Sequence, residues 1–156
     1  MRGLTENPKD QENQRSEALK LIEELELTPT SGDKARPSIC IIEDDGVTVQ
    51  LMKAILASEK YPVLSFEDPL VALAQIKEYN ITLLFLDIKL PGMNGLELLA
   101  KLRVEDAIPA CKVIVSTGYA KREIIMQILQ APIDGIVFKP FRKEIVLRYA
   151  SRFGKK

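Results

Sequence analysis

The sequence predicts an α/β protein built on a doubly wound, five-stranded parallel sheet, and three observations support this prediction. Short apolar runs alternate five times with segments that carry the apolar spacing of a helix. The third and fourth runs are nearly continuous, as expected for strands covered on both faces of a parallel sheet. Right-handed crossovers between such strands give an open sheet, whose functional edge lies at the carboxyl ends of the strands.

The individual elements follow from these patterns in chain order. We expect strands at the five apolar runs, namely residues 38–42, 62–66, 81–87, 111–117 and 135–139. We expect helices where apolar residues recur at helical spacing, namely residues 47–58, 69–79, 96–103, 121–130 and 141–153. Pro69 suits the first turn of the second of these helices, and Asn94 is a good N-cap for the third.

The beginning of the chain differs in character from the rest. We assign residues 1–36 to an N-terminal extension and residues 37–156 to the domain itself. Residues 1–15 are polar, so we expect them to be disordered or loosely held. Residues 16–27 have the spacing of a short amphipathic helix, and a linker follows it. The sequence leaves open whether this helix packs on its own domain, pairs with another copy or docks elsewhere.

Composition limits the compartment of the protein and its partners. Of the 156 residues, 46% are hydrophobic and 28% charged, and 22 basic residues balance 22 acidic ones, so no global field favours nucleic acid or an acidic membrane. No apolar run reaches the roughly 18 residues of a membrane span. The polar N-terminus has no signal-peptide pattern, so we expect no membrane insertion and a cytoplasmic location. Cys40 and Cys111 lie in apolar runs and are expected to be buried thiols of a reducing compartment.

Acidic residues follow two of the expected strands. Glu43 and Asp44 follow the first strand, and Asp87 ends the third. Because these strands are neighbours in a doubly wound sheet, the three carboxylates should converge and repel one another. A divalent cation would relieve this repulsion, and in a chain without histidine the oxygen ligands favour Mg²⁺. Taken alone, such an acidic run would more often be a solvated helix N-terminus, and Asp45 is expected to be solvated or structural.

A hydroxyl group and a cation stand at the same predicted edge. Thr117 ends the fourth strand and Lys139 the fifth. Beside a metal ion they would make a site for an oxyanion. A carboxylate at a strand end, such as that of Asp87, can act as a nucleophile and form an aspartyl phosphate. Gly118 would leave room for the phosphoryl group, and the loop after Asp87 would hold the metal.

Four short motifs, in one order, carry a family resemblance. They are IIEDD after the first strand, LDIKLPGMNGLEL after the third, VIVSTGYA through the fourth and VFKPF after the fifth. Together they cover residues 38–153, and the chain resembles a response regulator receiver domain of two-component signalling, of the stand-alone, chemotaxis-regulator-like kind. The resemblance implies a flavodoxin-like fold with five helices and the strand order 2-1-3-4-5.

The resemblance also implies a metal site. Asp87 resembles the phosphoacceptor, and the implied Mg²⁺ ligands are Glu43, Asp44, Asp87 and the backbone carbonyl of Lys89. Asp44 is the expected direct ligand of the acidic pair, whereas Glu43 would act partly through water. The side chains of Lys89 and Tyr119 occupy positions that tune the survival of the phosphoryl group, and we predict a lifetime of minutes or longer.

Further roles are implied for the fourth and fifth strands. Thr117 resembles the hydroxyl that turns toward the phosphoryl group, and Lys139 resembles the lysine that pairs with it. The Lys139–Pro140 bond is expected to be cis. Ile136 stands where the family often has an aromatic residue that swings inward on activation, which puts an aromatic rotation coupled to Thr117 in doubt.

The function implied by the resemblance is a phosphorylation-dependent signalling switch. A phosphohistidine on a sensor histidine kinase or histidine phosphotransfer protein would donate to Asp87 with Mg²⁺ bound. The domain would catalyse its own phosphorylation and dephosphorylation without being a turnover enzyme. We expect no DNA-binding module after Phe153, and therefore a downstream protein target or a relay and no direct nucleic-acid contact. Two alternatives are an aspartyl-phosphate-forming phosphatase, which would need a second acid where Lys89 stands, and a degenerate receiver acting only as a binding module.

The helix expected at residues 121–130 is apolar around about half of its circumference, more than a one-sided surface helix needs. It is either a deeply packed helix or an exposed face for a partner. In receivers this helix belongs to the output and dimerisation surface, so a homodimer through the 121–130 face is one option. Basic residues crowd the last helix, but they are weak evidence for nucleic-acid binding.

Overall fold

The computed structural model describes residues 7–26, 36–118 and 121–156. Leu27 at the end of the predicted helix 16–27, most of the predicted linker after it, and the predicted lifetime residue Tyr119 lie outside this part of the chain.

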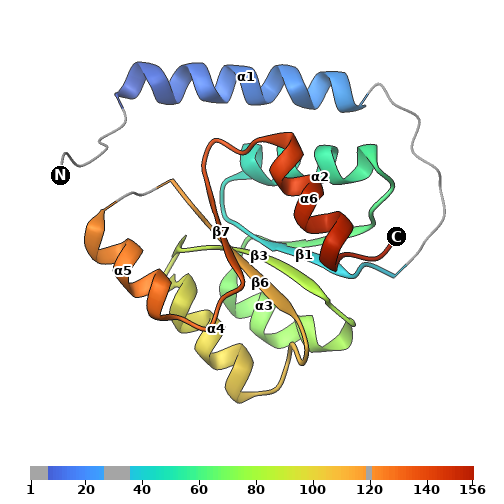
Figure 1. The fold of residues 1–156 in the computed structure, drawn as a ribbon, viewed down its shortest axis with the longest axis vertical. Coiled ribbons are helices and arrows are strands. Elements are labelled where there is room, and N and C mark those ends of the chain that lie inside the picture. Colours follow the sequence, from blue (N-terminus) through green and yellow to red (C-terminus); the bar gives the residue numbers. More distant parts are fainter. Residues whose placement is uncertain (1–6, 27–35, 119–120) are drawn as a thin grey trace.

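A five-stranded parallel sheet forms the centre of the molecule (Figure 1). Its strands are β1 (Ile39–Ile42), β2 (Val63–Phe66), β3 (Leu83–Asp87), β6 (Lys112–Thr117) and β7 (Gly135–Phe138). The observed order is β2-β1-β3-β6-β7, which is the predicted order 2-1-3-4-5. The labels differ because an unpredicted antiparallel pair of very short strands, β4 (Lys89–Leu90) and β5 (Met93–Asn94), intervenes along the chain.

Helices cover both faces of this sheet. They are α2 (Gly46–Ser58), α3 (Pro69–Gln75), α4 (Gly95–Val104), α5 (Arg122–Gln130) and α6 (Lys143–Phe153), preceded by the N-terminal helix α1 (Pro8–Glu26). In Figure 1, α2 and α6 lie above the sheet, and α3, α4 and α5 lie below it. The predicted helix 69–79 ends early, at Gln75, and continues as a 3-10 turn over Ile76–Glu78. Within the described residues, the structure contains no helix with the length and apolar content needed to cross a membrane.

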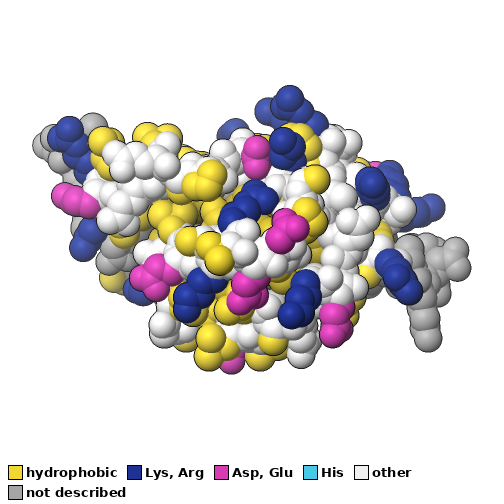
Figure 2. Space-filling view, turned by 90° about the horizontal axis from the view of Figure 1, so that it is seen from below, with side chains coloured by type: hydrophobic (Ala, Val, Ile, Leu, Met, Phe, Trp, Pro, Cys, Tyr) yellow, Lys and Arg dark blue, Asp and Glu magenta, His cyan; other side chains and the backbone are white. Residues whose placement is uncertain are grey.

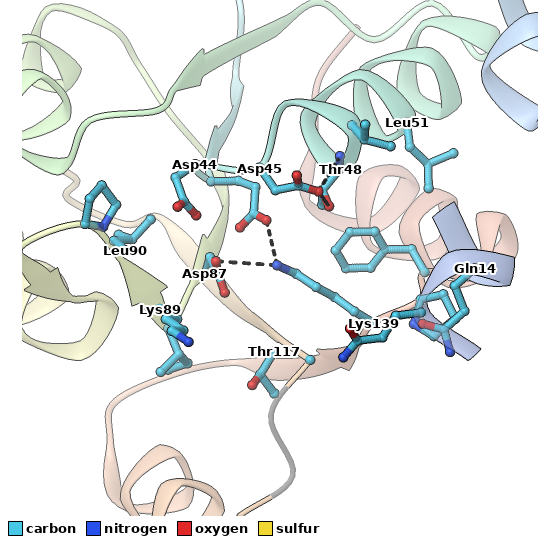
Figure 3. Close-up of a pocket in the computed structure, with 18 of the residues that line it drawn as sticks. Gln14, Asp44, Asp45, Thr48, Leu51, Asp87, Lys89, Leu90, Thr117 and Lys139 are labelled. Carbon is cyan, nitrogen blue, oxygen red and sulfur yellow. Dashed lines mark hydrogen bonds and ion pairs between the residues drawn. The ribbon is translucent and has the colours of Figure 1, made fainter. Parts of the chain in front are cut away.

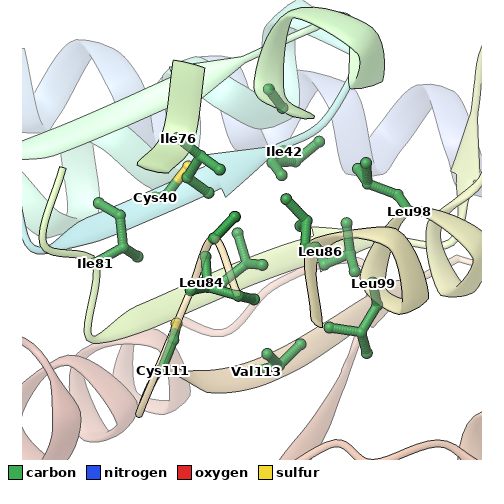
Figure 4. Close-up of a cluster of buried hydrophobic side chains, with 14 of the residues drawn as sticks. Cys40, Ile42, Ile76, Ile81, Leu84, Leu86, Leu98, Leu99, Cys111 and Val113 are labelled. Carbon is green, nitrogen blue, oxygen red and sulfur yellow. The ribbon is translucent and has the colours of Figure 1, made fainter. Parts of the chain in front are cut away.

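Alternate residues of each strand fill two hydrophobic cores. In β1, Ile39 and Ile41 face the core under α2 and α6. Cys40 and Ile42 face the opposite core under α3 and α4, which also holds Cys111 (Figure 4). Both thiols are buried, as predicted. Burying an aliphatic side chain of this size stabilises the fold by about 1.5–3 kcal/mol, so the central strands make a firm base for the residues at their ends.

The prediction for the first fifteen residues is wrong in part, because α1 begins at Pro8 and not at Ser16. Asn7 starts the helix: its side-chain Oδ1 accepts a hydrogen bond from the N–H of Lys9 at 3.1 Å. Proline is well suited to the first helical turn, since its missing N–H has no helical partner there. The polar residues that follow are good helix formers, and they lie largely on exposed positions.

The extension packs on its own domain. Helix α1 lies outside α2, on the far side of α2 from the sheet (Figure 1). Ile22 is 5% exposed and belongs to the same hydrophobic core as Ile41, and Ala18 and Leu21 pack against that core. Of the three placements that the sequence leaves open, the structure therefore has the intramolecular one.

Candidate functional site

Three acidic residues meet at the carboxyl edge of the sheet. Glu43 and Asp44 follow β1, and Asp87 is the last residue of the neighbouring strand β3. One carboxylate oxygen from each lies within 4.8 Å of the other two. Glu43 and Asp87 are only 2% and 5% exposed, whereas Asp44 is open to solvent. The structure thus brings these three residues together, while their individual roles stay predictions.

Lys139 reaches the two buried acids from the end of β7. Its Nζ lies 2.6 Å from Oε1 of Glu43 and 3.4 Å from Oδ2 of Asp87 (Figure 3). Its backbone N–H donates to the carbonyl of Thr117 at 2.9 Å, and the Lys139–Pro140 bond is cis, as predicted. A single ammonium group therefore faces two carboxylates at once.

Glu43 is the least satisfied of the acids. Its Oε2 is buried and has no hydrogen-bond partner among the described residues. Burial raises the pKa of Glu43 well above its usual range, and the Asp87 carboxylate beside it adds to the rise, against the lowering effect of Lys139. A proton or a hard cation would satisfy such an oxygen. The three carboxylates fit a divalent cation such as Mg²⁺ by the type of their donor atoms and by their spacing.

Asp45, the third acid of the run, has a structural role. It caps α2, because its Oδ2 accepts hydrogen bonds from the N–H of Thr48 at 3.2 Å and from the Thr48 hydroxyl at 2.6 Å. Partial burial would raise the pKa of Asp45, but the hydrogen bonds from Thr48 and Arg15 outweigh it and lower the pKa below its usual value. This is the structural alternative that the sequence leaves for Asp45.

The loop after Asp87 depends on glycine. Gly92 has a φ of +72° in the turn between β4 and β5, a conformation that side chains disfavour. A Cβ on Gly95 would collide with the carbonyl oxygen of Asp87, so glycine lets α4 begin directly against the end of β3. Asn94 caps α4 as predicted: its Oδ1 accepts from the N–H of Leu96 at 2.7 Å.

The remaining predicted site residues surround the acids. Thr117, Gly118 and Lys89 line the same pocket, with Thr117 buried and the Lys89 side chain exposed (Figure 3). A Cβ on Gly118 would make only ordinary contact with Lys139, so this position has spare room. The Lys89 carbonyl as a ligand and Thr117 as a switching hydroxyl stay predictions.

The pocket also has a wall that the sequence did not predict. The pocket has a volume of about 980 Å³. Four residues of α1 line it beside the sheet edge, namely Gln11, Gln14, Arg15 and Ala18. Arg15 forms an ion pair with Asp45, with Nη1 3.2 Å from Oδ1. The Asn–Pro pair at residues 7 and 8 is a signal for a helix start, but the sequence carries no signal for the surface that this helix contacts.

Helix α5 is packed on one side and exposed on the other, so both interpretations of its sequence hold in part. Ile128 is fully buried, while Met126 and Leu129 are 49% and 66% exposed. Ile136 in β7 is half-buried and packs against the small core that contains Ile128. Figure 2 views the molecule from below Figure 1, on the side of α3, α4 and α5, and shows hydrophobic side chains interspersed with charged ones.

Comparison with protein families gives a match over most of the domain. The model described as "Response regulator receiver domain" matches residues 39–150. Among curated proteins, the DNA-binding response regulator MtrA of Mycobacterium tuberculosis is 28% identical over 121 residues, which are 77% of this chain and 52% of MtrA. The chain thus spans about half the length of the curated relatives it matches.

Solved structures share the fold. A CheY-like response regulator receiver domain protein from Methanospirillum hungatei is 32% identical with a TM-score of 0.66, covering 76% of this chain and 93% of that one. The receiver domain of the sensor histidine kinase PA1611 from Pseudomonas aeruginosa is 24% identical with a TM-score of 0.69, covering 76% and 98%. The PA1611 structure has a magnesium ion coordinated in its active site cleft.

Proposed function

This chain belongs to the response regulator receiver family, and from that premise we propose that it works as a phosphorylation-dependent switch in which Asp87 accepts the phosphoryl group. One observation carries the proposal: Lys139 lies 3.4 Å from Oδ2 of Asp87 within a cluster of three carboxylates at the sheet edge. The donor would be a phosphohistidine on a sensor histidine kinase or on a histidine phosphotransfer protein.

The proposed transfer forms one bond and breaks one bond. A carboxylate oxygen of Asp87 attacks phosphorus, and the phosphorus–nitrogen bond of the phosphohistidine breaks, leaving its electron pair on the imidazole nitrogen. The product is an aspartyl phosphate. Lys139 would offset the charge on the phosphoryl oxygens, and the hydroxyl of Thr117 would hydrogen-bond them. Dephosphorylation would follow when water attacks the same phosphorus, and the domain itself would promote both steps.

Mg²⁺ is the cofactor that we propose for this site. Its protein ligands would be Glu43, Asp44, Asp87 and the backbone carbonyl of Lys89. The unpartnered Oε2 of Glu43 and the close spacing of the carboxylates support this assignment, as does the magnesium ion in the PA1611 receiver. When bound, Mg²⁺ would neutralise the carboxylates and part of the phosphoryl charge.

The proposed output is a protein contact that phosphorylation strengthens or weakens. A phosphoryl group adds about −1.5 to −2 charges and would shift an existing equilibrium between two arrangements of the domain. The half-exposed apolar side of α5, with Met126 and Leu129, is the surface we assign to a downstream protein or to a second copy. A cytoplasmic location would fit such partners.

Two other functions have less support. A phosphatase with the same aspartyl chemistry would need an acid two residues after Asp87, where this chain has the exposed Lys89. A degenerate receiver would have lost part of the site, whereas the acids, Thr117 and Lys139 are all present at one edge.

A phosphorylation assay tests the proposal against both alternatives. The purified chain is incubated with Mg²⁺ and acetyl phosphate, and its intact mass is followed. We expect one phosphoryl group per chain, lost in Asp87→Asn and unchanged in Asp106→Asn, which alters an exposed acid in the loop before β6. Continuous hydrolysis without a phosphorylated chain would favour the phosphatase, and no reaction would favour the binding module.

A further inference from the structure

We propose that α1 is a gate for the phosphorylation pocket that discriminates between phosphoryl donors by size: small donors reach Asp87 past it, while a protein donor must displace it. The inference rests on the proposed function of Asp87, but the geometry on which it stands concerns only access to the pocket. Four observations support it, namely where α1 is anchored, how far it extends, which residues line the pocket and how weakly α1 is held there.

The anchor of α1 lies in its C-terminal half, away from the acids. Ile22 is 5% exposed and belongs to the core under α2, and Leu21 packs on the same core. Leu19, at the edge of this packed face, is 48% exposed. Among the side chains of α1 that the structure describes, Ile22 is the one buried aliphatic residue, with Ala18 and Leu21 partly buried beside it. Helix α1 is thus attached from outside to a domain that has its own complete sheet and helices.

The N-terminal half of α1 extends beyond the start of α2. Arg15 in the middle of α1 pairs with Asp45, the residue that caps the first turn of α2. Figure 1 shows α1 and α2 side by side, and their sequence colours advance in the same direction along both helices. The residues from Pro8 to Arg15 therefore project past the start of α2 by about 10 Å, at 1.5 Å per residue.

This projecting half lies at the mouth of the site. Gln11, Gln14 and Arg15 line the pocket that also contains Asp87 and Lys139. Figure 3 shows Gln14 on the side of the pocket where Lys139 enters. The acid site therefore has the sheet edge as its floor, and α1 supplies part of its wall.

Access to Asp87 depends on the size of the donor. Asp87 is only 5% exposed at the bottom of a pocket of about 980 Å³. A pocket of this volume admits a small molecule such as acetyl phosphate. A histidine side chain is short, so a phosphohistidine reaches Asp87 only if the backbone that carries it comes down to the rim. The rim on one side is α1, and the two backbones would compete for the same space.

The contact at the rim is weak enough for displacement. The Arg15 and Asp45 side chains are 56% and 37% exposed, and ion pairs with such exposure contribute little. A protein donor would therefore replace the rim contact at small cost, provided that its own contacts compensate for it. If α1 is displaced in only a small fraction of the molecules, the apparent affinity for a protein donor is the intrinsic affinity multiplied by that fraction.

The first test measures access without any phosphoryl chemistry. Cysteine is introduced at the site as Asp87→Cys, and its modification rate is compared for a small methanethiosulfonate reagent and for a maleimide carried by a small folded protein through a short linker. The parent chain gives the background of Cys40 and Cys111, which are both buried. The same rates are then measured with α1 undocked by Ile22→Glu, and with the matched control Leu19→Glu on the exposed side of α1.

We expect Ile22→Glu to raise the rate of the protein-borne reagent by about tenfold or more, with the small reagent changed by less than about twofold. Leu19→Glu should change neither rate. The milder variant Leu21→Glu should give an intermediate increase, and it keeps the test valid if Ile22→Glu fails to fold. Equal effects on both reagents, or no effect of undocking, would overturn the proposal while leaving the phosphoacceptor role of Asp87 untouched.

The second test uses phosphoryl transfer with Asp87 restored. Acetyl phosphate is compared with autophosphorylated catalytic domains of histidine kinases as donors to the full chain. Undocking by Ile22→Glu or Leu21→Glu should speed transfer from the protein donors and leave the acetyl phosphate rate unchanged, and Leu19→Glu should behave like the parent. Slower transfer from the protein donors would mean that α1 helps to bind them, which would overturn the gate.

Discussion

Two ion pairs near the pocket contrast the interior of this protein with its rim. Lys139 and Glu43 lie 2.6 Å apart with side chains 22% and 2% exposed, whereas Arg15 and Asp45 lie 3.2 Å apart with side chains 56% and 37% exposed. In the first pair water is largely excluded, so neither group can exchange its partner for solvent. In the second pair water can replace either partner. The same chemistry therefore makes a water-excluded charge cluster at the sheet edge and a solvent-exposed contact at the rim.

The largest expected effect comes from breaking the interior pair. Lys139→Ala leaves Glu43 and Asp87 buried side by side without their cation, so we expect a loss of about 3 kcal/mol in the free energy of unfolding without Mg²⁺. Urea unfolding at neutral pH measures it. The control Lys112→Ala breaks a more exposed pair with Asp134, at 3.7 Å, and should cost less than about 1 kcal/mol. Equal losses of unfolding free energy in Lys139→Ala and Lys112→Ala would show that the interior pair stabilises the fold no more than the exposed pair does.

A backbone change behind Asp87 should have the next largest effect. Gly95→Ala places a methyl group against the carbonyl oxygen of Asp87, and relieving that contact should cost about 1–3 kcal/mol and slow phosphorylation by acetyl phosphate. The matched change Gly46→Ala, at the start of α2, meets no atom within 4 Å and should change stability by less than about 0.5 kcal/mol. Thermal unfolding of both variants distinguishes them, and an unaffected Gly95→Ala would contradict the close approach.

The interior acids should also make Mg²⁺ binding depend on pH. Burial raises the pKa of Glu43, so the folded site holds a proton where a free glutamate is ionised. Stability without Mg²⁺ should therefore fall as the pH rises above the ordinary glutamate pKa of about 4.3. Because a bound ion displaces this proton, calorimetry across the neutral range should show Mg²⁺ binding up to about tenfold tighter per pH unit. Glu43→Gln should weaken this pH dependence. A Mg²⁺ affinity of the parent that did not change with pH would contradict the displacement of a proton from Glu43.

The smallest effect is expected at the rim. Arg15→Ala should lower the free energy of unfolding by less than about 1 kcal/mol at neutral pH, since the pair is exposed. The pKa of Asp45 is lowered in the folded state, so this contribution is present above the ordinary aspartate pKa of about 3.9 and is lost as the pH falls below it. Unfolding midpoints of the parent and Arg15→Ala should therefore converge in acid, with Lys9→Ala as the exposed control. A difference that persisted in acid would contradict the ion pair.

The fold and the acid cluster could be predicted from the sequence because they depend on regular rules. Apolar runs such as the one ending at Asp87 have to be buried, and parallel strands bring their carboxyl ends to one edge. A local signal also sufficed for the Asn94 cap, whereas the cis bond at Pro140 followed from the family resemblance. The short β4–β5 pair escaped prediction because two-residue strands leave no periodic pattern.

The N-terminal helix shows where such rules stop. Its apolar spacing from Ala18 to Ile22 indicated a helix, but its polar first half looked like a disordered segment, although Asn7 and Pro8 supply a helix start. Polar residues are compatible with disorder and with an exposed helix, and only contacts with the rest of the chain separate the two.

By itself, the sequence determined the alternation of strands and helices and the convergence of Glu43, Asp44 and Asp87, because periodicity and strand ends follow from local chemistry. The strand order followed from the family resemblance that the motifs carry. Only the tertiary structure decided that Lys139 contacts both buried acids and that α1 lines one side of the pocket. The physical reason is that the position of a surface helix depends on the sum of small contacts between residues far apart in the chain, such as Arg15 with Asp45 and Ile22 with the core under α2. No local sequence pattern predicts the total of these contacts.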